Sequence, residues 1–129
     1  MTFFRDDFDD IGARIRDVDP IELERVSELF RAVRSRRRKV ILVENGGSSA
    51  MASHVAVDLT KTAGVRAVNF SSADLLTCFA NDHGYPLWVD KALEFYSDPG
   101  DALVLISRSG RSLNILNGAT AARHTECTS

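Results

Sequence analysis

The stretch that decides the fold is Val40-Ile41-Leu42-Val43-Glu44-Asn45-Gly46-Gly47-Ser48-Ser49. Its leading apolar run is mostly β-branched and too short for a helix, so it predicts a buried strand. Gly46 and Gly47 allow a sharp turn whose backbone N–H groups can come close to a ligand. Ser48 and Ser49 follow at a helix start, where free N–H groups and the helix dipole favour an anion. The stretch therefore predicts a phosphate or carboxylate site, with a plain turn as the alternative.

A second serine-rich loop strengthens this prediction. The apolar run 102–106 predicts another buried strand, and a helix is expected to begin near Leu113. Between them lies Ser107-Arg108-Ser109-Gly110-Arg111-Ser112. Ligands of parallel α/β sheets bind beyond the carboxyl ends of the strands, where both loops are expected. Hydroxyls and N–H groups from two such loops can surround a phosphate without a lysine, which favours a phosphate site over two plain connections.

The rest of the chain predicts strands that alternate with helices. Asp19-Pro20 reads as a helix start, the next helix covers about 48–61, and 66–70 alternates like a strand. Ser71-Ser72-Ala73-Asp74 reads as a capping box, and Pro86 as the start of a further helix. Strands separated by helices predict an α/β fold: a doubly wound, mostly parallel sheet with helices on both faces.

An apolar stripe precedes this domain. Its members recur at helical spacing: Phe4, Phe8, Ile11, Ile15 and Val18. The helix must bury the stripe against the core or against another subunit. We favour the subunit contact and predict a homodimer or homotetramer.

Composition excludes several classes of function. The net charge of −2 argues against broad nucleic-acid binding, and we interpret the basic run 34–39 as a solvated helix end. No apolar segment approaches the length of a membrane span. The acidic N-terminal region does not resemble a signal peptide. Cys78 and Cys127 lack paired spacing, which predicts reduced thiols in a cytoplasmic protein.

His54, Asp58 and Lys61 form a polar stripe on the helix that follows the glycine turn. His54 and Asp58 are spaced to contact each other, either as a surface pair or as part of a site. They could supply two ligands to a metal ion, but two ligands do not complete a zinc site.

Motifs in this order resemble the sugar isomerase (SIS) domain family, and within it the phosphoheptose isomerases. The matching segments are 45–48, 52–60, 81–82 with 84–85, 99–101 and 106–112. The resemblance implies an SIS-type Rossmann-like sandwich over residues 38–129, of which only part is present, preceded by oligomer-forming helices in 1–37.

The resemblance also implies a function, which is binding of a phosphosugar and its aldose–ketose isomerisation through an enediolate. It implies a cradle at Gly46 and Gly47, sugar contacts from Asn45 and Asp82, and phosphate contacts from Ser48, Ser107, Ser109 and Ser112. Asp58 stands where the family has its catalytic Glu, and His54 matches a histidine that binds metal in some members. These two are the predicted catalytic residues and metal ligands, with zinc as the one candidate cofactor.

Several features depart from the family pattern. Glu44 replaces a usual Gly, Asp58 is one methylene shorter than Glu, and Arg108 and Arg111 replace smaller polar residues. The chain ends before the family's remaining strands and its C-terminal helix, which carries a further catalytic His and Gln. We therefore expect isomerase activity from a form that includes this helix. The alternative is a non-catalytic SIS module that senses a phosphosugar or binds a protein partner.

Overall fold

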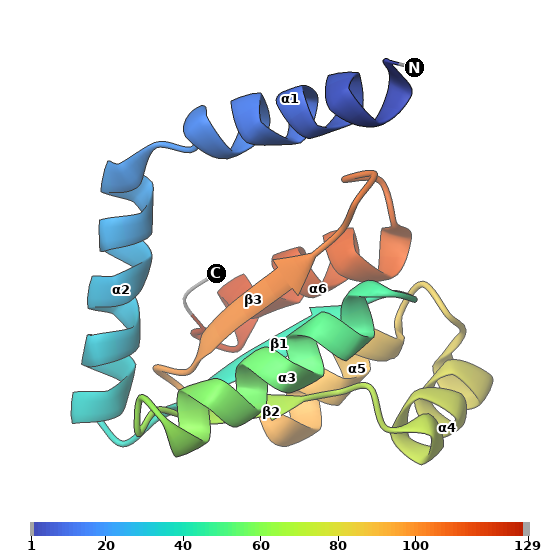
Figure 1. The fold of residues 1–129 in the computed structure, drawn as a ribbon. Coiled ribbons are helices and arrows are strands. Elements are labelled where there is room, and N and C mark those ends of the chain that lie inside the picture. The colour runs from blue at the N-terminus through green and yellow to red at the C-terminus, as the bar shows by residue number, and fades with distance from the viewer. Residues whose placement is uncertain (1, 128–129) are drawn as a thin grey trace.

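The computed structural model describes residues 2–127, which contain the elements labelled in Figure 1. The helices are α1 (Phe3–Arg16), α2 (Pro20–Ser35), α3 (Ser48–Lys61), α4 (Ala73–His83), α5 (Trp88–Tyr96) and α6 (Leu113–His124). The strands are β1 (Lys39–Glu44), β2 (Arg66–Asn69) and β3 (Ala102–Ile106). The predicted ranges 1–37 and 38–129 extend to residues 1, 128 and 129, which lie outside the described residues.

The strands form one parallel sheet in the order β2-β1-β3. β1 is the central strand, and its residues Val40 to Val43 are at most 2% exposed. A run that is apolar at every position suits this place, because both faces of a central parallel strand are covered.

Side chains of β1 alternate between two apolar cores. Val40 and Leu42 pack on one face with residues of α2 and α3, including Val33 and Ala52. Ile41 and Val43 pack on the other face with residues of α5 and α6. Helices therefore cover both faces, as Figure 1 shows, which confirms the predicted doubly wound parallel fold.

Local signals placed most element boundaries correctly, with two corrections. Ser72 does precede α4, but its side chain makes no capping hydrogen bond, so the capping box is wrong. α5 begins at Trp88 rather than at Pro86. By contrast, Asp19 caps α2 as predicted by accepting a hydrogen bond from the Ile21 N–H at 2.9 Å.

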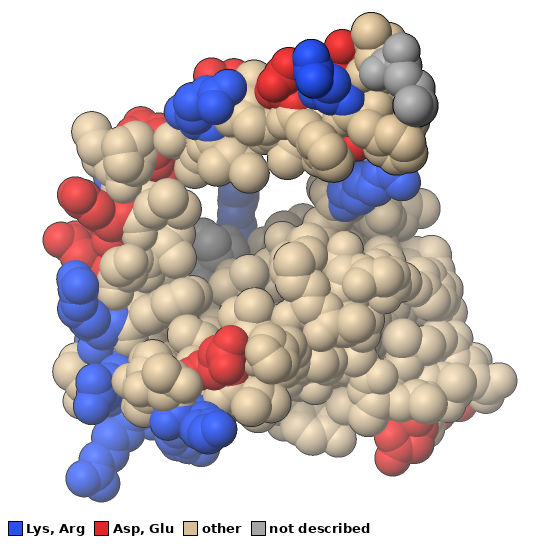
Figure 2. Space-filling model, in the orientation of Figure 1, with Lys and Arg blue, Asp and Glu red and all other residues tan. Residues whose placement is uncertain are grey.

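α1 lies apart from the α/β layers. None of its residues is buried, and every member of its apolar stripe is exposed. Figure 2 shows open space between α1 and the rest of the chain, with mainly uncharged side chains on the side of α1 that faces this space. Among the described residues, no helix is long and apolar enough to cross a membrane.

Candidate functional site

The candidate site lies where β1 and β3 end side by side. Glu44 and Ile106, the last residues of these strands, are partners in the parallel register. After β1 the chain enters α3 on one face of the sheet, and after β3 it enters α6 on the other face. Such a point, where the chain leaves neighbouring strands in opposite directions, is the usual ligand site of an open α/β sheet.

A hollow of about 370 Å³ occupies this position. Five of the predicted binding residues line it together with Ile106 and Arg108: Asn45, Ser48, Ser107, Ser109 and Ser112. The predicted Gly46 and Gly47 form the turn that joins Asn45 to Ser48. The fold thus brings together two loops that are about 60 residues apart in the sequence.

The glycine turn leaves the start of α3 open. Gly46 has a φ of 60°, which a residue with a side chain rarely adopts, and its carbonyl accepts a hydrogen bond from the Ser49 N–H at 3.0 Å. A Cβ on Gly46 or Gly47 would meet no atom within 4 Å, so the turn is not crowded. No side chain caps α3. Apart from the Ser49 N–H, the first N–H groups of α3 therefore remain available to an anion.

The serine loop is held in shape by its own hydroxyl oxygens. Ser107 Oγ accepts a hydrogen bond from the Gly110 N–H at 3.1 Å, and Ser109 Oγ accepts one from the Arg111 N–H at 3.2 Å. A serine hydroxyl that accepts a hydrogen bond can still donate its own proton. Ser112 precedes α6 without capping it through its side chain. The loop therefore offers hydroxyl donors and a second open helix start.

An amide pair fixes one wall of the hollow. Asn45 and Asn114 exchange hydrogen bonds of 3.1 and 2.9 Å through their side-chain amides. The Tyr85 hydroxyl donates to Asn45 Oδ1 at 2.8 Å. Asn114 is 2% exposed, so these bonds satisfy a buried polar group. Hydrogen bonds with α6 and with the segment before α5 therefore fix the orientation of the Asn45 side chain at the site.

Glu44 forms a buried polar cluster beside this site. The carboxylate is 4% exposed and accepts hydrogen bonds from Asn69 Nδ2 at 2.9 Å and from the Ser71 hydroxyl. Its other oxygen, Oε2, has no hydrogen-bond partner among the described residues. Burial raises the pKa of Glu44, and hydrogen bonds with Ser71, Asn69 and Ser49 only partly oppose this effect. The side chain ties the end of β1 to the end of β2.

We expect Glu44→Gln to change how stability depends on pH. Because the pKa of Glu44 is raised in the folded state, folding takes up a proton between the ordinary glutamate pKa and the raised one. This contribution to stability is fully present below the ordinary pKa and is lost as the pH rises through the raised value. Urea unfolding at about pH 4 and about pH 7.5 should therefore show the stability difference shifting in favour of the glutamine variant at the higher pH. A difference that is the same at both pH values would contradict the raised pKa.

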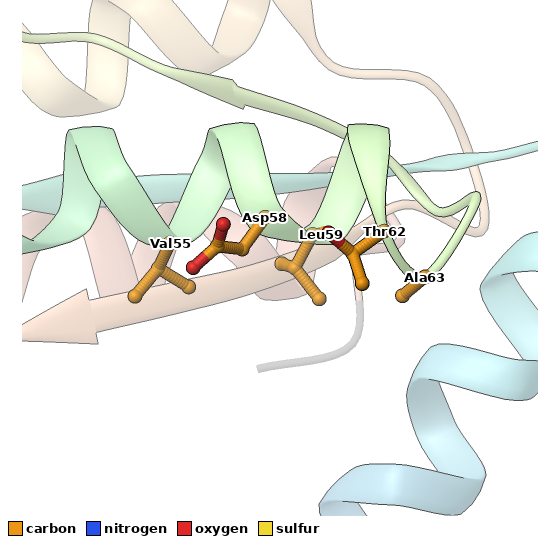
Figure 3. A pocket seen from close by; sticks show the side chains of 5 residues that line it. All are labelled: Val55, Asp58, Leu59, Thr62 and Ala63. Atoms are coloured by element: carbon orange, nitrogen blue, oxygen red, sulfur yellow. The ribbon is translucent and has the colours of Figure 1, made fainter.

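The predicted catalytic pair lies away from the hollow. His54 Nε2 is 3.5 Å from Asp58 Oδ2, and the two side chains are 79% and 60% exposed. At 1.5 Å per residue, they lie about 9 Å and about 15 Å along α3 from Ser48. Figure 3 shows Asp58 with Val55 and Leu59 at a separate hollow of about 520 Å³ on α3. Within this chain, the structure does not bring the pair and the serine loops into one pocket.

The His54–Asp58 pair does not make a zinc site alone. Zinc in proteins takes at least three protein ligands. In residues 2–127 no three His, Cys, Asp or Glu side chains lie close enough together to hold a metal ion. The predicted zinc site therefore does not fit the residues of this chain by themselves.

Asp82, the second predicted sugar contact, also lies outside the hollow. It sits near the end of α4, where it is exposed and accepts a hydrogen bond from Asn81 Nδ2 at 3.0 Å. Sequence reasoning missed Asn114, which joins the site through Asn45. Its position in the first turn of α6, directly after the serine loop, was the available signal.

The chain belongs to the SIS domain family, whose model matches residues 3–128. Within this family it is similar to phosphoheptose isomerases. It is 36% identical over 113 residues to the phosphoheptose isomerase of Aliarcobacter butzleri, a match that covers 81% of this chain and 59% of that protein. It is also 36% identical over 108 residues to the enzyme of Sulfurimonas denitrificans, covering 79% of this chain and 55% of the relative. The chain thus spans little more than half the length of these relatives.

Solved structures agree with this family. A phosphoheptose isomerase from Neisseria gonorrhoeae superposes with a TM-score of 0.85 at 26% identity and covers 98% of this chain and 68% of that one. A second, from Francisella tularensis, has the same TM-score at 22% identity, which supports the fold alone. The resemblance read from the sequence motifs is therefore confirmed at the level of family and fold.

Proposed function

We propose that the hollow between β1 and β3 binds the phosphate group of a phosphosugar. The observation that carries this proposal is the convergence of two serine-bearing loops, each leading into a helix without a side-chain cap, at the point where the chain direction switches. Hydroxyl and N–H donors bind phosphate through charge-assisted hydrogen bonds, and two helix dipoles add to the attraction. Similarity to phosphoheptose isomerases supports sedoheptulose 7-phosphate as the ligand.

We further propose that a longer form of the protein isomerises this ligand. Isomerisation moves a proton from the carbon beside a carbonyl to its neighbour, which requires a base and a second group to serve the oxygens. Asp58 is the proposed base, and His54, at 3.5 Å, is placed to orient it. In the present chain both are open to solvent, so the site needs a covering segment, such as a C-terminal helix or a second subunit, to exclude water from the base.

A coupled assay for conversion of sedoheptulose 7-phosphate to its aldose isomer tests the activity. We expect turnover in a form extended by the C-terminal helix, and a loss of 100-fold or more on Asp58→Asn, as expected for removal of a general base. Affinity measured by calorimetry should stay within about threefold, because Asp58 is distant from the serine loops. Absence of turnover in the extended form would exclude the isomerase.

A second candidate is a non-catalytic module that senses the same phosphosugar or binds a protein. Glu44 favours it, because the residue places a buried carboxylate directly before the proposed phosphate site. The exposed His54–Asp58 pair favours it too. Phosphosugar binding without turnover would support the sensor. If no phosphosugar binds, the result would exclude the sensor and favour the protein-binding role.

We propose that α1 joins copies of the chain into a homodimer or homotetramer. Its stripe exposes large side chains, with Phe8 and Ile15 exposed by 67% and 68%. The hollow on α3 beside Val55 and Leu59 offers a second apolar surface. Contiguous exposed apolar surface of this kind usually marks a protein interface.

Changing Phe8 to Asp should break this assembly. A charge in the middle of an apolar interface loses its hydration without gaining a partner. Light scattering coupled to size exclusion should give the mass of one chain for the Phe8→Asp variant and a multiple of it for the wild type. Arg5→Asp, on the same helix but outside the stripe, serves as the control and should keep the larger mass. A monomeric wild type would contradict the proposal.

The proposal also covers localisation and two classes of partner that we do not expect. We infer a cytoplasmic protein that acts neither on nucleic acid nor on a membrane. The net charge of −2 and two cysteines that form no disulfide support this inference.

A further inference from the structure

A group of arginines surrounds a second hollow at the opposite end of the sheet. The hollow measures about 380 Å³ and is lined by Gly64 and four arginines: Arg34, Arg37, Arg38 and Arg66. They come from the end of α2, from the segment that leads into β1, and from the start of β2. In Figure 2 the blue Lys and Arg atoms gather over this end of α2. We call these four residues with Gly64 the arginine basin.

Within the described part of the chain, no direct ion pair neutralises the positive charge of the basin. Among residues 2–127, no carboxylate oxygen lies within 4 Å of any of its four guanidinium groups. Asp98 is a nearby acid, but it is paired with Lys39 at 2.7 Å. Hydrogen bonding to Lys39 and its charge lower the pKa of Asp98 most, and Arg38 and Arg66 add smaller effects. The chain as a whole has a net charge of −2, but these four positive charges lie close together and repel one another. A bound anion would offset this repulsion.

The backbone holds the basin in shape. Arg37 has a φ of 56°, unusual for a residue with a side chain, and its carbonyl accepts a hydrogen bond from Arg66 Nη1 at 3.1 Å. This bond fixes one guanidinium at the rim and leaves its other N–H groups free to donate. Gly64 has a φ of 65°, and a Cβ there would lie 3.4 to 3.5 Å from the Arg34 guanidinium. The turn between α3 and β2 thus lets Arg34 lie close against the backbone.

We propose that the arginine basin binds a small polyanion with at least two phosphate groups. Guanidinium groups match phosphate oxygens in pairs, and four of them exceed what a single phosphate needs. The hollow is within the size range of small-molecule sites. Its residues surround a pocket rather than forming a stripe, which favours a compact ligand over a nucleic acid. The basic run 34–39 is therefore part of a binding site and not only a solvated helix end. This site is separate from the proposed phosphosugar site, at the other end of the strands.

Titration of the full chain with inorganic pyrophosphate tests the proposal. Calorimetry is done in a Ser48→Ala, Ser112→Ala background at about 0.15 M salt, so that the phosphosugar site is weakened and long-range attraction is screened. We expect pyrophosphate to bind at least tenfold more tightly than inorganic phosphate. Arg37→Gln with Arg66→Gln should weaken pyrophosphate binding at least tenfold. Arg5→Gln with Arg16→Gln on α1, which removes the same charge, should change it less than twofold.

Two results would overturn the proposal. Equal weakening by both arginine pairs would mean that net charge alone attracts the anion. Tighter binding of a single-stranded oligonucleotide than of pyrophosphate, also dependent on Arg37 and Arg66, would assign the basin to nucleic acid instead. Because the phosphosugar site is weakened in the serine background and lies at the other end of the strands, either result leaves the proposed function standing.

Discussion

Replacing Asp101 with alanine is expected to lower the free energy of unfolding by about 3–5 kcal/mol. The Asp101 side chain is fully buried and accepts hydrogen bonds from the Lys39 N–H at 2.9 Å and the Asp98 N–H at 2.8 Å. Lys39 Nζ lies 2.6 Å from the Asp101 carboxylate, and the Lys39 side chain is 12% exposed. Removing this carboxylate leaves the two N–H groups without their acceptor, and it takes from the largely buried Lys39 side chain the buried one of its two carboxylate partners, so that only the exposed Asp98 remains. The loss should be large because these groups join the starts of β1 and β3.

Asp98→Ala provides the matched control. Asp98 contacts the same Lys39 ammonium, but its side chain is 59% exposed, so water can replace it. Exposed pairs of this kind contribute less than about 1 kcal/mol. Urea unfolding monitored by circular dichroism should therefore separate the two variants by at least about 2 kcal/mol. Equal losses would show that the Asp101 cluster contributes no more than a surface ion pair.

Replacing Ser48 and Ser112 together with alanine should weaken binding of sedoheptulose 7-phosphate by about 100-fold or more. Each hydroxyl is proposed to donate to a charged phosphate oxygen, and such a hydrogen bond contributes about 1.5–3 kcal/mol. Both side chains lie at the hollow and neither caps its helix, so the double change should leave the fold intact.

Calorimetric titration measures this loss. Ser27→Ala serves as the control, because Ser27 is an exposed residue of α2 whose hydroxyl donates to the Leu23 carbonyl of the same helix. The Ser27→Ala variant should bind sedoheptulose 7-phosphate with the affinity of the wild type. A loss of less than threefold in the double variant, with unfolding unchanged, would remove the serines from the proposed phosphate site.

Local sequence signals were enough to predict the elements that frame the site. The apolar runs of β1 and β3 and the residues around them placed both strands and the starts of α3 and α6 correctly. These signals depend on only a few neighbouring residues, so they predict an element without knowledge of the rest of the fold. The contact between His54 and Asp58 followed from helical spacing for the same reason.

Long-range packing could not be read in this way. Trp88, which is 1% exposed, belongs to one of the two cores, yet nothing in the sequence around it distinguished it from other apolar residues. The pairing of Asn45 with Asn114 joins positions 69 residues apart. The arginine basin likewise depends on β2 placing Arg66 next to the end of α2. Each of these depends on the strand order, which the local pattern does not specify.

The sequence also could not predict where the proposed catalytic pair lies relative to the serine loops. Helix spacing predicted that His54 and Asp58 would meet, but not that they would face solvent rather than the serine loops. Their role depends on what covers α3, and the chain spans only 59% of its Aliarcobacter butzleri relative.

The central claim is that the two loops at the ends of β1 and β3 bind the phosphate of a phosphosugar. NMR of the ¹⁵N-labelled chain titrated with sedoheptulose 7-phosphate tests it most directly, since each backbone amide reports its own surroundings. We expect saturable shifts of the amides in 45–49 and 107–114, with little change in 34–38. Shifts confined to other segments, or none at these two loops at saturating ligand, would contradict the account.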